Sequence, residues 1–257
     1  MGLTPALSPV LRLNFITFAC ESPERVATFW CELLDGYDGE PSGDAYVARG
    51  DGPSLFFHRH EKSPTIELPI HLDVNVPDRD AELERLLGLG ARLVETKSHQ
   101  IGDLSEIWTV MRDPEGNGFC IQSPPNTEAR RVGNVTFSCA SPISLGKFWA
   151  SALGWPDEPI DDGFIRQLVD AGMDERERES FYVTRETPTS RPRLLFQRRE
   201  KSRPASYPIH LDFLAEDREI ELERLTRLGA TVEETKSNGD TTWTVMRDPE
   251  SNPFCVE

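Results

Sequence analysis

Short runs in which hydrophobic and polar residues alternate are separated by runs with helical spacing along most of the chain. Near the start, Ile16, Phe18 and Cys20 share one face of an extended chain, and Phe15 and Thr17 share the other. A period of two predicts a β-strand. The chain therefore begins its folded part with a strand over residues 11–20.

A helix is predicted directly after this strand. Ser22 can cap its first turn, and Pro23 suits the first helical position, where no amide donor is needed. Its apolar stripe has helical spacing and consists of Val26, Phe29, Trp30, Leu33 and Leu34. A loop over residues 38–44 and strands over 45–49 and 54–60 complete a βαββ module.

A second module begins with the strand at residues 70–76. His71, Asp73 and Asn75 share one face of this strand, and the aliphatic residues between them share the other. A helix over residues 78–89 and three further strands over 92–96, 107–112 and 118–122 follow. This module is βαβββ.

The whole arrangement is then repeated. Ile209-His210-Leu211-Asp212 repeats Ile70-His71-Leu72-Asp73, and Trp243 to Glu250 repeats Trp108 to Glu115. An internal repeat of this length predicts tandem units, which we place at residues 1–123 and 131–257 with a linker at 124–130. The spacing between matched positions rises from 119 (Cys20 to Cys139) to 139 (His71 to His210). About 20 residues around Asp161–Ser180 are therefore inserted, and they predict an added, solvent-facing helix.

Several repeated motifs resemble those of the vicinal oxygen chelate superfamily, which includes glyoxalase I, the bleomycin-resistance proteins and the extradiol dioxygenases. They are the His-Leu-Asp strand, the Leu-Gly-Ala end of the helix and the closing Asp-Pro-Glu turn with Phe-Cys after it. The glyoxalase-like domain branch is the most similar. The resemblance implies an α+β fold of tandem glyoxalase/bleomycin-resistance/dioxygenase-like domains. Each domain would consist of two βαβββ-type modules that form an open curved sheet, or cup, with the helices outside.

The resemblance also implies where a metal site would lie, because members that use a metal take His, His and Glu from three strands. The matching positions hold Phe15, His71 and Cys120 in the first half, and Asn134, His210 and Cys255 in the second. Phenylalanine cannot bind a metal, asparagine is a poor ligand for a transition metal, and a catalytic site generally needs three protein ligands. We therefore expect no metal and no cofactor. A divalent Zn, Ni, Mn or Fe ion is the alternative.

The two histidines are the candidate catalytic residues. His71 lies two residues before Asp73, and His210 two residues before Asp212, so each pair shares a strand face. A histidine held by a carboxylate can act as a general acid or base. The other interpretation is a buried histidine that lines the cup without reacting.

Other side chains are candidates for binding a ligand. Cys120 and Cys255 should share the cup face with the histidines, either as nucleophiles or as small buried hydrophobic residues. Trp108 and Trp243 can form an aromatic wall. Arg59 and Arg198 can hold an anion at the rim, or they are solvated strand ends. His58 and His60 are spaced like a metal pair, but the repeat replaces them by Gln197 and Arg199, which favours a surface position.

Composition narrows the class of partner. The formal net charge is −16 and the pI about 4.8, which argues against nucleic acid or an anionic membrane as the partner. Five cysteines without framework spacing indicate reduced thiols in a cytoplasmic protein. Residues 1–10 lack a signal-peptide pattern, and no apolar run approaches membrane-spanning length. We expect an acidic, cytoplasmic monomer or homodimer with a small-molecule ligand.

Two functions from different classes fit these observations. The first is an enzyme of the lyase, isomerase or dioxygenase-like class that binds a small organic molecule in its cup, with a degenerate or absent metal site and histidine as acid and base. The alternative is a non-catalytic drug- or metabolite-binding protein of the bleomycin-resistance type. A degenerate scaffold is a third interpretation. The second half, with Asn134, His210 and Cys255, is the preferred site.

Overall fold

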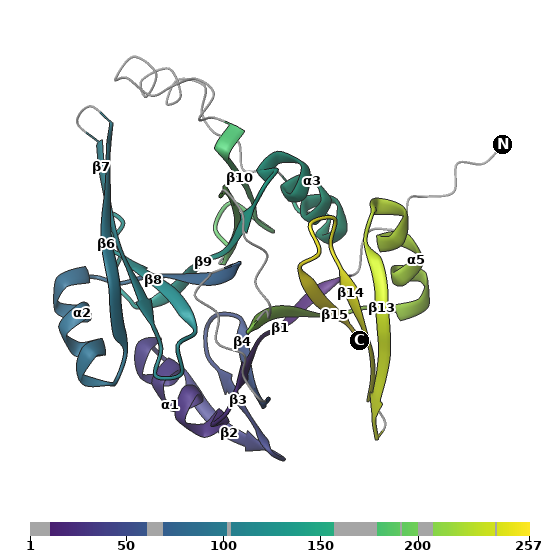
Figure 1. Cartoon of the computed structure of the whole chain (residues 1–257), viewed down its shortest axis with the longest axis horizontal. Helices are drawn as coiled ribbons and strands as arrows, with labels where there is room; N and C mark the ends of the chain where they lie inside the picture. The colour runs from purple at the N-terminus through teal and green to yellow at the C-terminus, as the bar shows by residue number, and fades with distance from the viewer. Residues whose placement is uncertain are drawn as a thin grey trace.

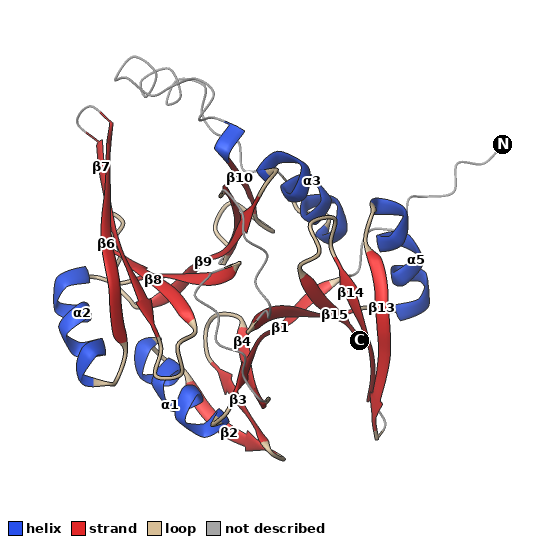
Figure 2. Ribbon diagram, in the orientation of Figure 1, coloured by secondary structure: helices blue, strands red, loops and turns tan. Residues whose placement is uncertain are grey.

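The computed structural model of the protein describes residues 11–60, 69–101, 104–156, 179–190, 192–199, 208–239 and 241–257. Four modules follow one another along the chain (Figures 1 and 2). The first contains β1 (Arg12–Cys20), α1 (Pro23–Leu33), β2 (Asp38–Ser42), β3 (Ala45–Arg49) and β4 (Ser54–Arg59). The second contains β5 (Ile70–Asn75), α2 (Arg79–Gly88), β6 (Arg92–Ile101), β7 (Leu104–Arg112) and β8 (Gly118–Gln122).

The second half repeats this order, except that its first module has two described strands after the helix instead of three. Its first module contains β9 (Arg131–Cys139), α3 (Pro142–Leu153), β10 (Phe181–Thr184) and β11 (Arg193–Arg198). Its second contains β12 (Ile209–Leu214), α5 (Arg218–Leu228), β13 (Thr231–Asn238), β14 (Thr241–Arg247) and β15 (Pro253–Val256). The α+β fold class with tandem glyoxalase-like modules and curved sheets is thereby confirmed. Among the described residues, no helix is long and apolar enough to span a membrane.

The modules pair differently from the expectation. Sheet A has the strand order β13-β14-β15-β12-β1-β4-β3-β2, and sheet B has the order β10-β11-β9-β5-β8-β7-β6. Each sheet thus joins one module from each half, through β1 with β12 in sheet A and β5 with β9 in sheet B. The sequence does not determine which first strands pair. The strands β1, β5, β9 and β12 have the same alternation of hydrophobic and polar residues, and each has an edge available for pairing.

The two modules of one half are held together by a helix instead of a shared strand pair. Trp30 of α1 lies against Phe18 of sheet A and Phe119 of sheet B, with ring centres 5.0 and 5.4 Å apart. Trp149 of α3 does the same between Phe137 of sheet B and Phe254 of sheet A, at 5.7 and 5.1 Å. Both indoles are fully buried. Each therefore packs one sheet against the other within the continuous hydrophobic core.

The repeated Asp-Pro-Glu turn reinforces this packing. Asp113 is fully buried and accepts hydrogen bonds from Trp30 Nε1 (3.3 Å) and Asn117 Nδ2 (2.6 Å) and from two backbone amides of its own turn. The carboxylate of Glu115 accepts hydrogen bonds from the backbone N–H groups of Glu21 and Ser22, both at 2.7 Å. The predicted cap at Ser22 is wrong in one respect. The residue occupies the N-cap position, but its side chain makes no capping hydrogen bond. Glu115 instead binds the backbone N–H groups just before the helix.

One local prediction also changes, and another is not tested. Residues 38–42, expected as a loop, form the edge strand β2, which pairs antiparallel with β3. The inserted segment around Asp161–Ser180 lies almost entirely outside the described residues, so its predicted helix stays a prediction.

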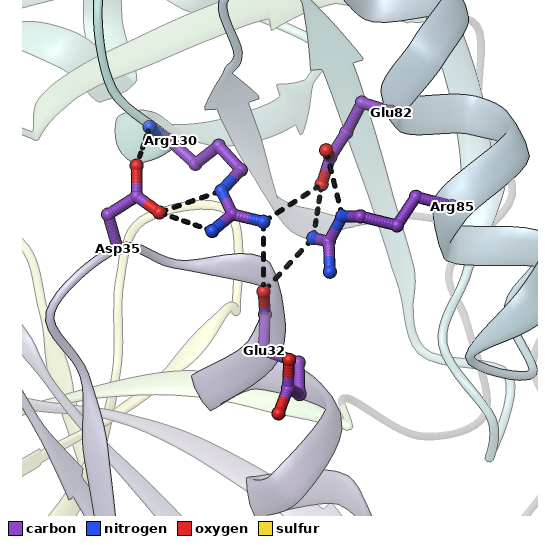
Figure 3. Close-up of polar contacts among 5 residues, drawn as sticks. All are labelled: Glu32, Asp35, Glu82, Arg85 and Arg130. Atoms are coloured by element: carbon purple, nitrogen blue, oxygen red, sulfur yellow. Dashed lines mark hydrogen bonds and ion pairs between the residues drawn. The ribbon is translucent and has the colours of Figure 1, made fainter.

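A cluster of charged side chains fastens the linker to the first half (Figure 3). Arg130 donates from Nε to Asp35 Oδ1 at 2.8 Å and from Nη1 to the carbonyl oxygen of Glu32 at 3.3 Å. Arg85 of α2 donates to the same carbonyl at 3.0 Å and forms an ion pair with Glu82. The C-terminal end of α1 is therefore held by α2 and by the residue that precedes β9. Burial alone would raise the pKa of Asp35, but the hydrogen bonds and charge of Arg130 outweigh it and lower the pKa.

Arg130→Ala should reduce the free energy of unfolding by up to about 1 kcal/mol at pH 7, as expected for a partly exposed ion pair. Because the folded-state pKa of Asp35 is lowered, this stabilisation is present above the unfolded pKa of about 4 and is lost as the pH falls through the folded value. Urea unfolding of both proteins from pH 7 to pH 3 measures the difference. Arg227→Ala, which removes an exposed ion pair with Glu223, is the control. A difference that stays constant with pH would contradict the account.

Asp113→Ala should lower the free energy of unfolding by about 3 kcal/mol or more, because it leaves Trp30 Nε1 and the amides of its turn buried without an acceptor. Asp248→Ala, at the equivalent turn with Trp149 (3.2 Å), should cost a similar amount. Chemical denaturation measures both. Glu84→Ala on the exposed face of α2 should stay within about 0.5 kcal/mol. Equal effects of Asp113→Ala and Glu84→Ala would show that the turn does not hold the modules together.

Candidate functional site

The candidate residues lie on the inner face of each sheet, by which we mean the face opposite the helices. Phe213 and Phe254 point to Trp149 of α3, so the alternating positions Asp212 and Cys255 point the other way. In sheet A this face carries Thr17, His210, Asp212 and Cys255. In sheet B the equivalent positions carry Thr136, His71, Asp73 and Cys120.

The structure regroups the predicted site residues. Phe15 lies opposite Asp212 on the neighbouring strand, and Asn134 lies opposite Asp73. In each expected set of three residues, the first residue therefore belongs to the other set. Phe15 belongs with His210 and Cys255, and Asn134 belongs with His71 and Cys120. The preference for a site made by the second half alone was wrong, because each site takes residues from both halves.

In sheet B, Asp73 is the centre of a buried polar network. Its Oδ2 accepts hydrogen bonds from Thr136 Oγ1 (2.7 Å) and Asn134 Nδ2 (2.9 Å), and its Oδ1 lies 3.3 Å from His71 Nε2. Arg193 of β11 in turn donates to Asn134 Oδ1 at 2.9 Å. Burial would raise the pKa of Asp73, but the contact with His71 and the hydrogen bonds outweigh it and lower the pKa. The carboxylate is therefore ionised and holds the imidazole in place.

His71 has one ring nitrogen without a partner. Nε2 faces Asp73, whereas Nδ1 is buried and has no hydrogen-bond partner among the described residues. A buried polar atom without a partner costs free energy, so a group that satisfies Nδ1 would bind here with advantage. The arrangement orients an imidazole by a carboxylate. Because Nδ1 is buried, a ligand can reach this second nitrogen only after a side-chain movement.

The cysteines are poor nucleophiles in this setting. Burial, followed by the charge of Asp73, raises the pKa of Cys120, and burial, followed by the charge of Asp212, raises that of Cys255. Nucleophilic attack requires the thiolate. Without a metal ion, both side chains are neutral thiols next to a carboxylate, which fits the hydrophobic interpretation of these positions better than the nucleophilic one.

Sheet A has the same central residues with different neighbours. Thr17 donates its hydroxyl to Asp212 Oδ2, and His210 Nε2 lies 3.1 Å from Asp212 Oδ1. Burial would raise the pKa of Asp212, but the charge of His210 and the contact with Thr17 lower it. Phe15 cannot donate a hydrogen bond as Asn134 does, so Oδ2 of Asp212 accepts from Thr17, whereas Oδ2 of Asp73 accepts from both Thr136 and Asn134. This face is also more open, since the side chains of His210 and Asp212 are 18% and 20% exposed, against 8% and 9% for His71 and Asp73.

Two further histidines lie on this face, although the sequence favoured a surface position for both. They are His58 of β4 and His60 just after this strand. The ring of His58 lies 6.3 Å from that of His210 and 6.0 Å from that of His60, between centres. Burial, followed by the charges of His210 and His60, lowers the pKa of His58. His58 was expected at the surface because Gln197 replaces it in the repeat. That difference between the halves, together with the alternation around the buried Phe57, was the signal that could have found it.

The remaining candidates divide between the two faces. Trp108 and Trp243 are half-buried. Each lies two residues before a valine, Val110 or Val245, that pairs with an inner-face cysteine of the neighbouring strand, Cys120 or Cys255. Both tryptophans are therefore on the inner faces. Arg59 and Arg198 are not. Each directly follows an inner-face residue of its strand. Arg59 donates to the backbone carbonyl of Glu21, and Arg198 donates to that of Glu179. Their proposed anion site on the cup rim is therefore wrong, because strand alternation turns them to the opposite face.

Donor atoms that could hold a metal gather on both inner faces. One nitrogen of His71, one oxygen of Asp73 and the sulfur of Cys120 lie within 4.8 Å of one another, and so do the equivalent atoms of His210, Asp212 and Cys255. Sheet A offers a further nitrogen donor for a zinc-type ion, because the ring centre of His58 lies 6.3 Å from that of His210. Sheet B fits less well, because Asp73 is engaged by Asn134 and Thr136 and the position of His58 holds Gln197.

Comparison with known proteins agrees with this architecture. Glyoxalase I from Zea mays superposes with a TM-score of 0.62 at 12% identity, over 96% of this chain and 92% of that chain. A putative dioxygenase from Bacillus subtilis subsp. subtilis str. 168 has a TM-score of 0.59 at 11% identity, over 95% and 84%. At such identities the likeness concerns the fold alone. A search of curated protein sequences found no match.

Membership of a family comes from a sequence model. The model described as a glyoxalase-like domain matches the chain twice, over residues 15–122 and over residues 134–257. The two matches together span well over half of the chain and coincide with the two copies of the repeat. The chain therefore belongs to the glyoxalase-like domain family.

Proposed function

We propose that the protein binds a small organic molecule on the inner face of sheet B and acts on it as an enzyme of the lyase, isomerase or dioxygenase-like class. His71 is the general acid and base, and Asp73 is the carboxylate that orients it. The observation that carries the proposal is the buried His71–Asp73 contact of 3.3 Å, in which Nδ1 of His71 has no hydrogen-bond partner in the described part of the chain. Family membership supports the choice of class but does not select among its reactions.

The surroundings of His71 favour an oxygen-bearing ligand. Arg193 and Asn134 form a hydrogen-bonded pair beside the Asp73 network, and Arg193 brings positive charge to the half-buried inner face. Carbonyl and carboxylate groups are well matched to guanidinium and imidazole donors. Because His71 and Asp73 are buried, little water is present to screen these interactions. A ligand whose proton lies next to a carbonyl group would suit this arrangement.

The chemistry assigned to His71 is transfer of one proton. In this proposal a ligand proton passes to Nδ1 of the neutral imidazole, and the imidazolium that forms is stabilised by the ionised Asp73 at Nε2. The proton can then return to another atom of the ligand or be exchanged with solvent. The step needs no oxidant and no metal on this face. Correctly placed acid–base groups of this kind contribute about 10²- to 10⁴-fold in rate.

A non-catalytic binding role is the second candidate, and one observation favours it. On sheet A, Phe15 and Phe56 form an aromatic pair with ring centres 5.5 Å apart, and both are only half-buried. A planar ligand could stack there without any reaction. A cytoplasmic location and a monomeric state remain part of the proposal. The latter is supported by the fact that each sheet is completed within one chain.

The test is exchange of ligand protons with solvent. Chelator-treated protein is incubated in D₂O with a panel of small carbonyl- and carboxylate-bearing molecules, and deuterium incorporation is followed by NMR. His71→Gln should reduce the exchange rate by about 100-fold or more, whereas the matched variant His210→Gln should leave it within a few-fold. Binding without exchange in the native protein would favour the non-catalytic role. Equal exchange by native protein and His71→Gln would contradict the assignment of His71.

A further inference from the structure

Sheet B has a positive charge on its inner face that sheet A lacks. Arg193 of β11 is paired with Asn134 of β9, and the equivalent pair in sheet A is Ser54 of β4 with Phe15 of β1. Arg193 points to the inner face, because the next residue along β11, Leu194, is buried in the hydrophobic core. A guanidinium is charged at any physiological pH. Arginine in place of serine therefore gives the two faces a lasting difference in charge.

A second arginine lies where β11 ends. Arg199 continues the strand pairing, since its backbone N–H donates to the carbonyl oxygen of Cys139 at 2.9 Å. It is two residues beyond Gln197, an inner-face position, so its side chain leaves the backbone on the same face. In sheet A this place is taken by His60, whose N–H donates to the equivalent carbonyl of Cys20 at 2.9 Å. The inner face of sheet B thus has an arginine at each end of β11.

The thiols on the two inner faces are subject to charges of different sign. Burial, followed by the charge of the neighbouring aspartate, raises the pKa of both Cys120 and Cys255. At Cys120 the rise in pKa is opposed by two cations, Lys97 and Arg199. At Cys255 it is opposed by one lysine and increased by Glu234. The ligand site of sheet B is therefore the more positive of the two.

The arginines account for this difference, because the aspartate, lysine and glutamate positions are the same on both faces. Lys97 forms an ion pair with Glu95 at 2.9 Å, and Lys236 forms one with Glu234 at 2.7 Å. The chain as a whole has a formal net charge of −16. A positive inner face in so acidic a protein attracts anions to this place, because surroundings of low dielectric constant concentrate its field.

Arg193 is also held in a fixed position relative to the proposed acid–base residue. Its Nε donates to Asn134 Oδ1 at 2.9 Å, and Asn134 Nδ2 donates to Asp73 Oδ2 at 2.9 Å. A guanidinium can only donate hydrogen bonds, so it turns the amide oxygen towards itself and the amide nitrogen towards Asp73. Asp73 Oδ1 lies 3.3 Å from His71 Nε2. One chain of contacts therefore joins the cation to His71.

We propose that the sheet B site selects small molecules that carry a carboxylate, and that Arg193 is the specificity-determining residue that holds this group. The planar guanidinium matches a carboxylate with two parallel hydrogen bonds. Arg199 acts at longer range and draws the anion towards the site. The inference rests on the proposed function, since it names the substrate class of the His71 site. It narrows that class from carbonyl compounds in general to oxo acids.

The first test measures the charge of the site without a ligand. Native full-length protein is alkylated with iodoacetate, which is an anion, or with iodoacetamide, its neutral counterpart. Mass spectrometry follows the rates at Cys120 and Cys255, which are both buried. The ratio of the iodoacetate rate to the iodoacetamide rate should be about fivefold higher at Cys120 than at Cys255. Equal ratios at the two thiols would overturn the proposal.

Variants assign the charge to its source. Arg193→Ser combined with Arg199→His introduces the residues that sheet A has at both positions. The double variant should bring the ratio at Cys120 close to that at Cys255, whose own ratio should not change. Arg193→Lys keeps the charge and should retain most of the native ratio. Thermal unfolding checks that each variant is folded. An unchanged ratio at Cys120 in the folded double variant would also overturn the proposal.

The second test compares two ligands that differ in charge. Pyruvate and pyruvamide are each incubated with chelator-treated protein in D₂O, and each exchange rate is divided by the uncatalysed rate. The native protein should favour pyruvate by about tenfold, and Arg193→Ser should remove this preference and affect the amide little. No preference in the native protein would overturn this inference and leave the role of His71 intact. Exchange of neither compound would count against the proposed function, and the alkylation ratios would still decide the inference.

Discussion

Two buried tryptophans, each donating its indole N–H to a buried aspartate, hold the two sheets against each other. Trp30 reaches Asp113 and Trp149 reaches Asp248, and each indole also packs between aromatic rings of both sheets. Burial of an aromatic side chain contributes about 2–3 kcal/mol, and the hydrogen bond to a carboxylate directs that packing to one geometry. Because the tryptophan and the aspartate come from different modules of the same half, each half is joined across the sheets. The first strands of each half pair with strands of the other half.

That arrangement determines how the sites are composed. Since β1 pairs with β12 and β5 with β9, every inner face combines a His-Asp-Cys set from one half with a first strand from the other. Phe15 and His58 shape the surroundings of His210, and Asn134 and Arg193 shape those of His71. The two faces can therefore change independently by substitutions in β1 and β4 or in β9 and β11. The difference between Asn134 and Phe15 is one such substitution. It gives the buried Asp73 a hydrogen-bond donor that Asp212 lacks.

Much of the fold could be predicted from the sequence, because it depends on local periodicity. The alternation of β5 placed His71 and Asp73 on one face, and the repeat identified their partners in the second half. The pairing of modules could not be predicted, since four first strands have the same pattern and the choice among them depends on contacts distant in sequence, such as Trp30 with Phe119. Ser22 occupies the predicted N-cap position, but its hydroxyl makes no capping bond, and a carboxylate from a remote turn, Glu115, binds its backbone N–H instead. His58 was missed because its importance depends on the distance to His210, which no spacing along the chain contains.

The central claim is that each sheet and each site is assembled from both halves, and separate expression of residues 1–123 and 124–257 tests it most directly. Alone, each half would expose the unpaired edges of two first strands and should be unfolded or self-associated. Mixed, the halves should form a 1:1 complex by sedimentation, with one cooperative thermal transition close to that of the intact chain. Two halves that each fold as stable monomers and do not associate would contradict the account.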